Sequence, residues 1–140
     1  MPLRRPLLAL ALAGSLGISA CGGDDSGGSA SREPEEAQAT PAQAVAEIGE
    51  VRTALDRAVT SLKAGNAKQA DETVAEGYLQ HFEKVEGPLE KVDAELNEQL
   101  EDTIREELRD KIRDGGSVAE VTKMVDGIKA DLATAEQKLQ

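Results

Sequence analysis

The chain has 140 residues, of which 27 are acidic and 16 basic, and its formal net charge at pH 7 is -11. It contains one Cys, one His, one Tyr, one Phe and no Trp. A single cysteine excludes an intrachain disulfide. With one His and one Cys, the chain has few side chains suited to catalysis, so an enzyme is not expected. The acidic balance disfavours nucleic acid and anionic lipid as partners and favours cations or basic proteins.

Residues 1–20 have the features of a signal peptide. Arg4 and Arg5 form a short positive region, and an apolar run follows over residues 7–16. That run is too short to span a bilayer, which takes about 20 apolar residues. The two arginines loosely resemble a twin-arginine export motif, but Leu3 stands where that motif usually has Ser or Thr. A general secretory signal is therefore the favoured interpretation.

The sequence LGISAC at residues 16–21 resembles the lipobox of bacterial lipoproteins. The resemblance implies transfer of a diacylglyceryl group to Cys21, cleavage before it, and N-acylation in many bacteria. The alternative is an ordinary secretory signal with a chance cysteine. The lipoprotein interpretation is favoured because Cys21 is the only cysteine and a tether-like segment follows it. It places the protein outside the cytoplasm, anchored by lipid to the outer face of the cell membrane or to the periplasmic side of an outer membrane.

Residues 21–40 are expected to be the lipidated cysteine and a flexible tether. Residues 22–40 contain almost no large apolar side chain and are rich first in Gly and Ser, then in Pro and Glu. This composition is typical of a disordered linker. A flexible chain of about 19 residues reaches a few tens of ångströms from its anchor.

Residues 41–140 are predicted to form one helical domain, because long amphipathic runs dominate and no alternating strand pattern occurs. Thr40 and Pro41 predict the start of a first helix, and Gly65 its end. Asn66, with Gln69 three residues on, predicts a capping box at the start of the second helix. The buried stripe of the first helix is predicted to consist of Ile48, Val51, Leu55, Val59 and Leu62.

Residues 72–92 of the second helix show two opposed faces at about 100° per residue. The apolar face carries Val74, Tyr78, Phe82, Val85, Leu89 and Val92. The opposite face carries a strip of glutamates about 80° wide by the same helical wheel, namely Glu72, Glu76, Glu83, Glu86 and Glu90. Gly87-Pro88 is expected to kink or interrupt this helix.

Asp93 predicts the cap of a third helix, whose core residues are spaced every four positions and which Gly115-Gly116 ends. Glu101 and Arg105 are expected to form an ordinary ion pair on its surface. Ser117 and Glu120 predict a capping box for a fourth helix with a coiled-coil seam. The predicted core of the third helix is Leu96, Leu100, Ile104, Leu108 and Ile112, and the predicted seam is Val118, Val121, Val125, Ile128, Leu132, Ala135 and Leu139. The expected fold is all-α, a four-helix up-and-down antiparallel bundle that follows a signal peptide and a disordered tether.

A further resemblance lies in residues 54–139. Its pattern consists of Tyr78-Leu79, Phe82-Glu83, Val85-Glu86, Pro88-Leu89, Asp93, Leu100-Glu101, Leu108-Arg109 and the Gly115 break before a valine-rich helix. The pattern resembles the extracytoplasmic helical domain found ahead of the membrane part in some bacterial high-affinity iron permeases. The resemblance implies an accessory role in iron uptake, with an iron permease or another membrane protein as partner.

The chain also departs from that family. No membrane permease part follows, so transport itself is not implied. The permease motif Arg-Glu-x-x-Glu is absent, because Arg105 begins a run in which Arg109 takes the final glutamate's place. The imelysin-type His-x-x-Glu is absent as well, because Lys84 stands three residues after His81.

Clustered carboxylates are hard oxygen ligands suited to iron or another divalent cation. The candidate metal ligands are Glu83 and Glu86, with Glu90 and Glu76 assisting. None of the four has Lys or Arg at i±3 or i±4, so their charges are not compensated along the helix. A real site would need a further ligand from another helix or from a partner, and the alternative is a solvated face opposite the core. His81 has no carboxylate one turn away and is expected to be structural.

Two functions remain open from the sequence. The first is a membrane-anchored extracytoplasmic lipoprotein that acts as a non-enzymatic accessory or binding module in the uptake of iron or another metal cation. The alternative is a structural or adaptor lipoprotein whose helical bundle docks on a partner protein without binding metal.

Overall fold

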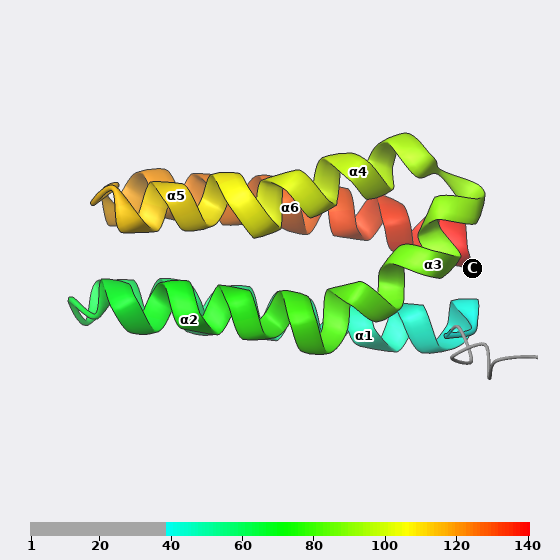
Figure 1. Ribbon diagram of the computed structural model, residues 1–140, viewed down its shortest axis with the longest axis horizontal. Helices are drawn as coiled ribbons and strands as arrows, with labels where there is room; N and C mark the ends of the chain where they lie inside the picture. The colour runs from blue at the N-terminus through cyan, green and yellow to red at the C-terminus, as the bar shows by residue number, and fades with distance from the viewer. Residues whose placement is uncertain (1–38) are drawn as a thin grey trace, which may run out of the picture. The chain divides into compact units, whose positions relative to one another are not determined.

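The computed structural model describes residues 39–140, so the predicted signal peptide, the predicted lipidation site Cys21 and nearly all of the predicted tether lie outside the described residues. The described part is an all-α bundle of four helical stretches, and it contains no strand. Figure 1 shows two layers, one with α1 and α2 and the other with α6 and the stretch from α4 to α5. The connections are short, so stretches that follow one another in the chain lie side by side, which confirms the predicted architecture.

The first stretch is α1, Pro41–Lys63. It begins with a complete capping box, in which Thr40 Oγ1 accepts from the Gln43 N–H and the Gln43 side chain accepts from the Thr40 N–H. It ends before Gly65, whose φ of +81° lies in the left-handed region that glycine adopts at little cost. Both ends therefore lie where the sequence predicts.

The second stretch consists of α2 (Ala67–Gly77), the π-helical turn η1 (Tyr78–Phe82) and α3 (Glu83–Val92). The predicted capping box at Asn66 is wrong, because its side chain makes no capping hydrogen bond. Asn66 directly follows the left-handed Gly65 and has φ -100° and ψ 67°, whereas the caps at Thr40 and Ser117 have an extended backbone.

The interruption expected at Gly87-Pro88 does not occur, because α3 continues through Pro88. The irregular part of this stretch lies upstream, in η1, where the helix widens to the π form. The ribbon of α3 leaves the line of α2 and crosses toward α4 (Figure 1). A π-turn and a proline are both established causes of such a change of direction.

The third stretch consists of α4 (Ala94–Asp102), a second π-turn η2 (Thr103–Glu107) and α5 (Leu108–Arg113). Asp93 caps it as predicted, since its carboxylate accepts a 3.0 Å hydrogen bond from the Leu96 N–H. No pattern in the sequence predicts η2. Gly115, with a φ of +79°, lies in the turn to the last stretch.

The last stretch is the single helix α6, Val118–Leu139. The predicted capping box of Ser117 and Glu120 is present. All of the predicted seam is buried except Val118, which is half-buried. The coiled-coil spacing of the sequence thus marks the face that packs on the other three stretches.

Every helical stretch contributes to one hydrophobic core. Val92 is the exception among the residues predicted for the apolar face of 72–92, since it is 51% exposed where α3 ends. Leu62 and Leu96 are only partly buried. Within residues 39–140, no helix is both long enough and apolar enough to cross a membrane. The largest fully buried side chains are Phe82, Ile48, Leu55, Leu89, Leu100, Ile104, Leu108, Ile112, Ile128, Leu132, Val51 and Val74.

Candidate functional site

The first π-turn decides where the predicted glutamates lie. A π-turn takes more residues per turn than an α-helix, so it shifts the register between the residues before it and those after it. A helical wheel drawn through 72–92 assumes one uninterrupted register. The predicted strip therefore divides at η1, with Glu72 and Glu76 on α2 and the other three on α3.

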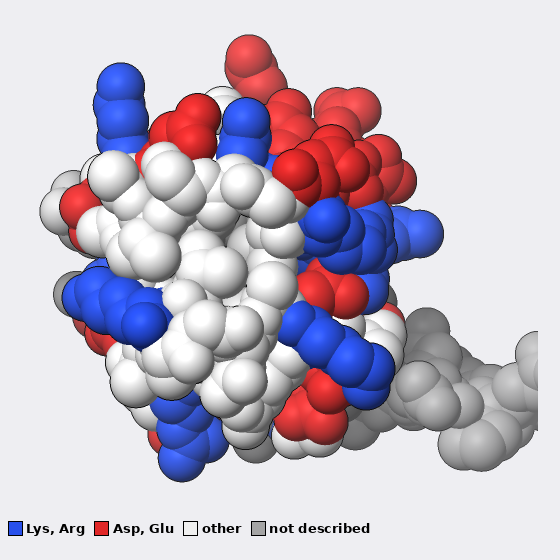
Figure 2. Space-filling model, turned by 90° about the vertical axis from the view of Figure 1, so that its left-hand side faces the viewer, with Lys and Arg blue, Asp and Glu red and all other residues white. Residues whose placement is uncertain are grey.

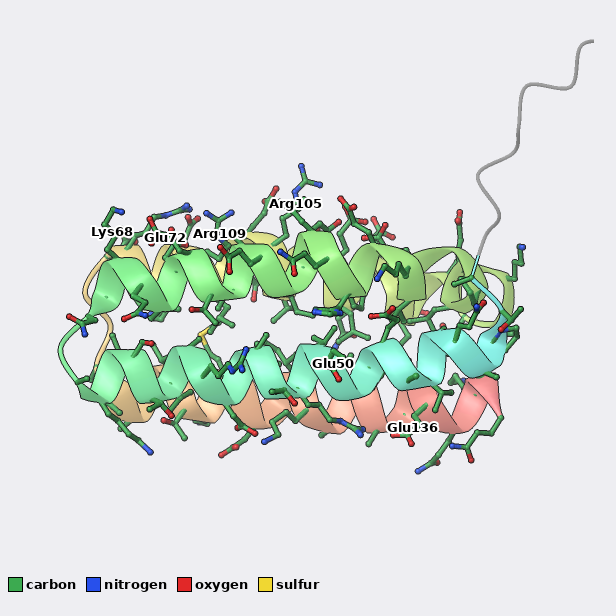
Figure 3. All side chains as sticks on the ribbon, turned by 90° about the horizontal axis from the view of Figure 1, so that it is seen from below. Glu50, Lys68, Glu72, Arg105, Arg109 and Glu136 are labelled. Atoms are coloured by element: carbon green, nitrogen blue, oxygen red, sulfur yellow. The ribbon has the colours of Figure 1, made fainter. Side chains whose placement is uncertain are left out.

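The two glutamates of α2 lie in different surroundings from the three glutamates of α3. Glu72 is exposed and forms an ion pair of 2.5 Å with Lys68. Figure 3 shows this pair on α2, at the edge of the bundle that also carries Arg105 and Arg109. Glu76 lines a shallow polar groove between α1 and α2, together with Thr53, Arg57 and Thr73.

Tyr78 and Glu86 connect η1 to α3. The Tyr78 hydroxyl donates a 2.5 Å hydrogen bond to Glu86 Oε1. The tyrosine is buried, with its ring centre 5.7 Å from that of Phe82. The one Tyr and one Phe of the chain thus anchor the π-turn in the core, and the phenol presents a donor to a half-buried carboxylate.

A second helix brings charges to the same place. Burial raises the pKa of Glu86, and the neighbouring carboxylates of Glu101 and Glu83 raise it further, against the opposing effects of Tyr78 and Arg105. Burial and the carboxylate of Glu86 also raise the pKa of Tyr78. Glu101 comes from α4, so carboxylates of two helices act on one another here.

The predicted ion pair between Glu101 and Arg105 is present at 2.9 Å. This pair raises the pKa of Arg105, and Tyr78 raises it further. Arg105 is about half exposed, with 54% of its side-chain surface open to solvent. The site thus consists of the buried phenol and the Glu86 carboxylate, and the charges of Glu83, Glu101 and Arg105 act on that carboxylate from around it.

The four predicted metal ligands do not share one environment. Glu83 and Glu90 are exposed on α3, Glu76 faces the α1–α2 groove, and Glu86 is half-buried beside Tyr78. Within residues 39–140, no three His, Cys, Asp or Glu side chains come together as a group that could hold a metal ion. Across helices, the charge of Glu101 acts on Glu86, whereas the sequence indicates only the ion pair of Glu101 with Arg105.

A second polar cluster joins η1 to α1. His81 Nδ1 lies 2.6 Å from Glu47 Oε2, and Lys84 Nζ lies 2.9 Å from Glu47 Oε1. The hydrogen bond with Lys84 has the largest effect in lowering the pKa of Glu47, and the hydrogen bond with His81 lowers it further. The carboxylate partner of His81 lies 34 residues away in the sequence, a separation that no local spacing rule detects.

Asp71 and Arg109 form a third cluster, between α2 and α5. Arg109 donates from Nε and Nη2 to the two carboxylate oxygens of Asp71, at 2.7 and 3.3 Å. This two-point contact fixes the second stretch against the third. Asp71 and Arg109 therefore serve to hold the two stretches together, and neither side chain is free to bind a ligand.

No protein-family model matches this chain. Searches of curated proteins and of solved structures find no match either.

Proposed function

We propose that this protein is a lipid-anchored, non-enzymatic accessory module outside the cytoplasm that binds iron or another divalent cation and serves its uptake. The proposal combines the lipobox-like residues 16–21, the net charge of -11 and the acidic site at η1. The resemblance of residues 54–139 to the extracytoplasmic domain of iron permeases supports the choice of iron. An iron permease or another membrane protein would then receive the cation.

One observation carries the metal part of the proposal, namely the position of Glu86. Its carboxylate is half-buried, accepts a hydrogen bond from Tyr78, and lies near Glu83 of its own helix and Glu101 of α4. Carboxylates that repel one another in a partly desolvated place gain from a cation that neutralises them. The charges along α3 alone do not create this environment, because Glu101 lies on the neighbouring helix α4.

Calorimetric titration of the purified protein with Fe²⁺ under anaerobic conditions, Mn²⁺ and Ca²⁺ tests cation binding. We expect weak, reversible binding by the wild type and loss of most of the heat in the double variant Glu83→Gln/Glu86→Gln. The matched control is Glu50→Gln/Asp126→Asn, which removes two exposed charges elsewhere and should keep the wild-type heats. Equal heats for all three proteins would leave the glutamates of α3 as a solvated surface.

Membrane fractionation tests the anchor. The variant Cys21→Ser cannot carry the lipid, so in a bacterial host we expect it to leave the membrane fraction and to incorporate no labelled fatty acid. A variant that stays in the membrane and is acylated like the wild type would contradict anchorage through Cys21. The neighbouring Ser19→Ala variant, which keeps a small residue before the cysteine, is the control and should remain acylated.

A second candidate function is that of a structural or adaptor lipoprotein. The surface at one end of the bundle favours this function. That end is formed by the turns at residues 64–66 and 114–117. Figure 2 shows uncharged surface across the centre of this end, with both basic and acidic side chains around it. Leu79, which is 59% exposed on η1, adds an apolar side chain to the surface of the bundle. The titration above separates the two functions, because an adaptor of this kind needs no cation.

A further inference from the structure

Asn97 is the one polar residue of the described chain that is buried with an unsatisfied oxygen. It lies in α4 and is 9% exposed, and its Oδ1 has no hydrogen-bond partner among residues 39–140. A buried acceptor without a partner has lost its hydrogen bonds to water and gained none in return, which destabilises the folded protein. Such a group therefore calls for a structural explanation.

The position of Asn97 in the helix connects it to the site at η1. Asn97 and Glu101 are one turn apart in α4, so their side chains leave the helix on the same face. Gln99, about 200° round the helix from both residues, pairs with Asp131 of α6 at 3.0 Å, so the face of Asn97 and Glu101 is turned away from that contact and toward α3, which packs against α4. Helical side chains lean toward the N-terminus, which brings the Glu101 carboxylate over the turn that contains Asn97.

We propose that Asn97 Oδ1, Glu101 and Glu86 together form a binding site for a hard divalent cation such as Mn²⁺ or Fe²⁺. This inference rests on the proposed function and adds to it two ligands from α4 that are absent from the predicted set. Two carboxylates match the double positive charge, and the amide contributes a neutral oxygen, the kind of ligand that such cations accept.

The chemistry of the neighbours favours a cation over a hydrogen bond within the site. Ionised Glu86 and Glu101 are acceptors, so neither can donate to Asn97 Oδ1. A cation satisfies all three oxygens and removes the repulsion between the carboxylates. The Tyr78 hydroxyl keeps Glu86 in place by donating to Oε1, which leaves Oε2 for the ion.

Arg105 is the competitor for this cation. It pairs with Glu101 in the unliganded protein, and its side chain is more than half exposed. An exposed pair of this kind contributes little to stability. Arg105 can therefore turn into solvent when the cation takes Glu101, and Arg105→Gln should tighten cation binding.

Thermal unfolding of the purified protein with and without Mn²⁺ tests the site. The wild type should melt at a higher temperature in Mn²⁺, because a ligand that binds only the folded state stabilises that state. Asn97→Leu removes the unsatisfied oxygen at similar volume, so without Mn²⁺ its melting temperature should equal or exceed that of wild type. In Mn²⁺ its increase in melting temperature should be lost, with at least about tenfold weaker binding, the size of effect seen when metal sites lose a supporting group.

A second variant keeps the test decisive if Asn97→Leu does not fold. Asn97→Asp retains the shape and adds a carboxylate, so it should be less stable than wild type in a chelator and should gain more from Mn²⁺ than wild type does. If wild type binds Mn²⁺ and loses it in Glu86→Gln, but Asn97→Leu, Asn97→Asp and Arg105→Gln all respond like wild type, the inference is wrong and the proposed function stands. If wild type shows no response to Mn²⁺ or Fe²⁺, both are wrong.

Discussion

The pair of Tyr78 and Glu86 shows at the scale of single residues how a common side chain acquires unusual properties. The carboxylate is half-buried, faces other carboxylates and is held by one phenol. Each of these conditions depends on the register that η1 imposes. A glutamate in an uninterrupted helix with the same sequence would lie on the solvated face that the helical wheel predicts.

The raised pKa of Glu86 should make the free energy of unfolding depend on pH. Because the folded state holds this proton more tightly than the unfolded state, the contribution of the group is fully favourable below its ordinary pKa of 4.5. It declines as the pH rises through the folded-state pKa. We expect Glu86→Gln, which stays neutral, to flatten this decline in free energies of unfolding measured by urea denaturation from pH 4.5 upward.

Other carboxylates act at lower pH and do not obscure this measurement. Capping and ion pairing lower the pKa values of Glu47, Asp93 and Glu120, so their contributions are present above the ordinary pKa and are lost as the pH falls. Glu90→Gln, an exposed change one turn after Glu86, is the control and should keep the wild-type profile. A profile for Glu86→Gln that coincides with that of wild type would contradict the assignment to Glu86.

At the scale of helices, the sequence was informative where a local rule decides the structure. Thr40, Asp93 and Ser117 cap helices as predicted, and the seam of α6 is buried. Local rules failed where the neighbouring backbone matters. Asn66 has the right side chain for a cap, but the left-handed Gly65 before it leads to a different backbone conformation.

The two π-turns mark the limit of prediction for the candidate site. The apolar pattern of 72–92 fits an α-helix well enough that no residue in it indicates η1. Without the turn, Glu86 belongs to a strip of five equivalent glutamates. With it, Glu86 faces Tyr78 and the neighbouring helix. The partner Glu101 was visible in the sequence only as half of an i,i+4 ion pair, because contacts between helices leave no local spacing.

Gly77 provides a prediction about the contact between α1 and α2. A Cβ at this position would lie 2.6 Å from the Cβ of Ala54, which is attached directly to the backbone of α1. Alanine gains about 1 kcal/mol over glycine in a helix, whereas overpacking costs about 1–3 kcal/mol. We expect Gly77→Ala to lower the free energy of unfolding by about 1 kcal/mol on balance.

Two further variants isolate the steric cause. Gly49 lies in α1 with no atom within 4 Å of its added Cβ, so Gly49→Ala should stabilise the protein through helix propensity alone. Ala54→Gly removes the atom that Gly77→Ala would meet, so the double variant should be more stable than the sum of the two single changes. Additive effects in urea denaturation would show that the close approach does not govern this contact.

At the scale of the whole described chain, ion pairs between helices accompany the common core. Arg52 of α1 pairs with Glu136 of α6 at 2.9 Å, and Lys129 of α6 pairs with Asp56 of α1 at 2.8 Å. Figure 3 shows Glu136 on α6, on the outside of the bundle. These pairs are partly exposed and each contributes little. The stability of the bundle must therefore come mainly from its apolar core.

This leads to a prediction about residues 41–140 as a separate protein. All four helical stretches bury residues in one core, and no disulfide is available to hold them, so the segment should fold by itself. Circular dichroism should show that more than half of its residues are helical. Leu132 is fully buried in the seam of α6, so Leu132→Ala should lower the free energy of unfolding by about 2–5 kcal/mol. Leu79→Ala removes the same atoms from a side chain that is 59% exposed and should cost far less. Equal melting of the two variants, or a helix content below half, would mean that the bundle needs the rest of the chain or a partner.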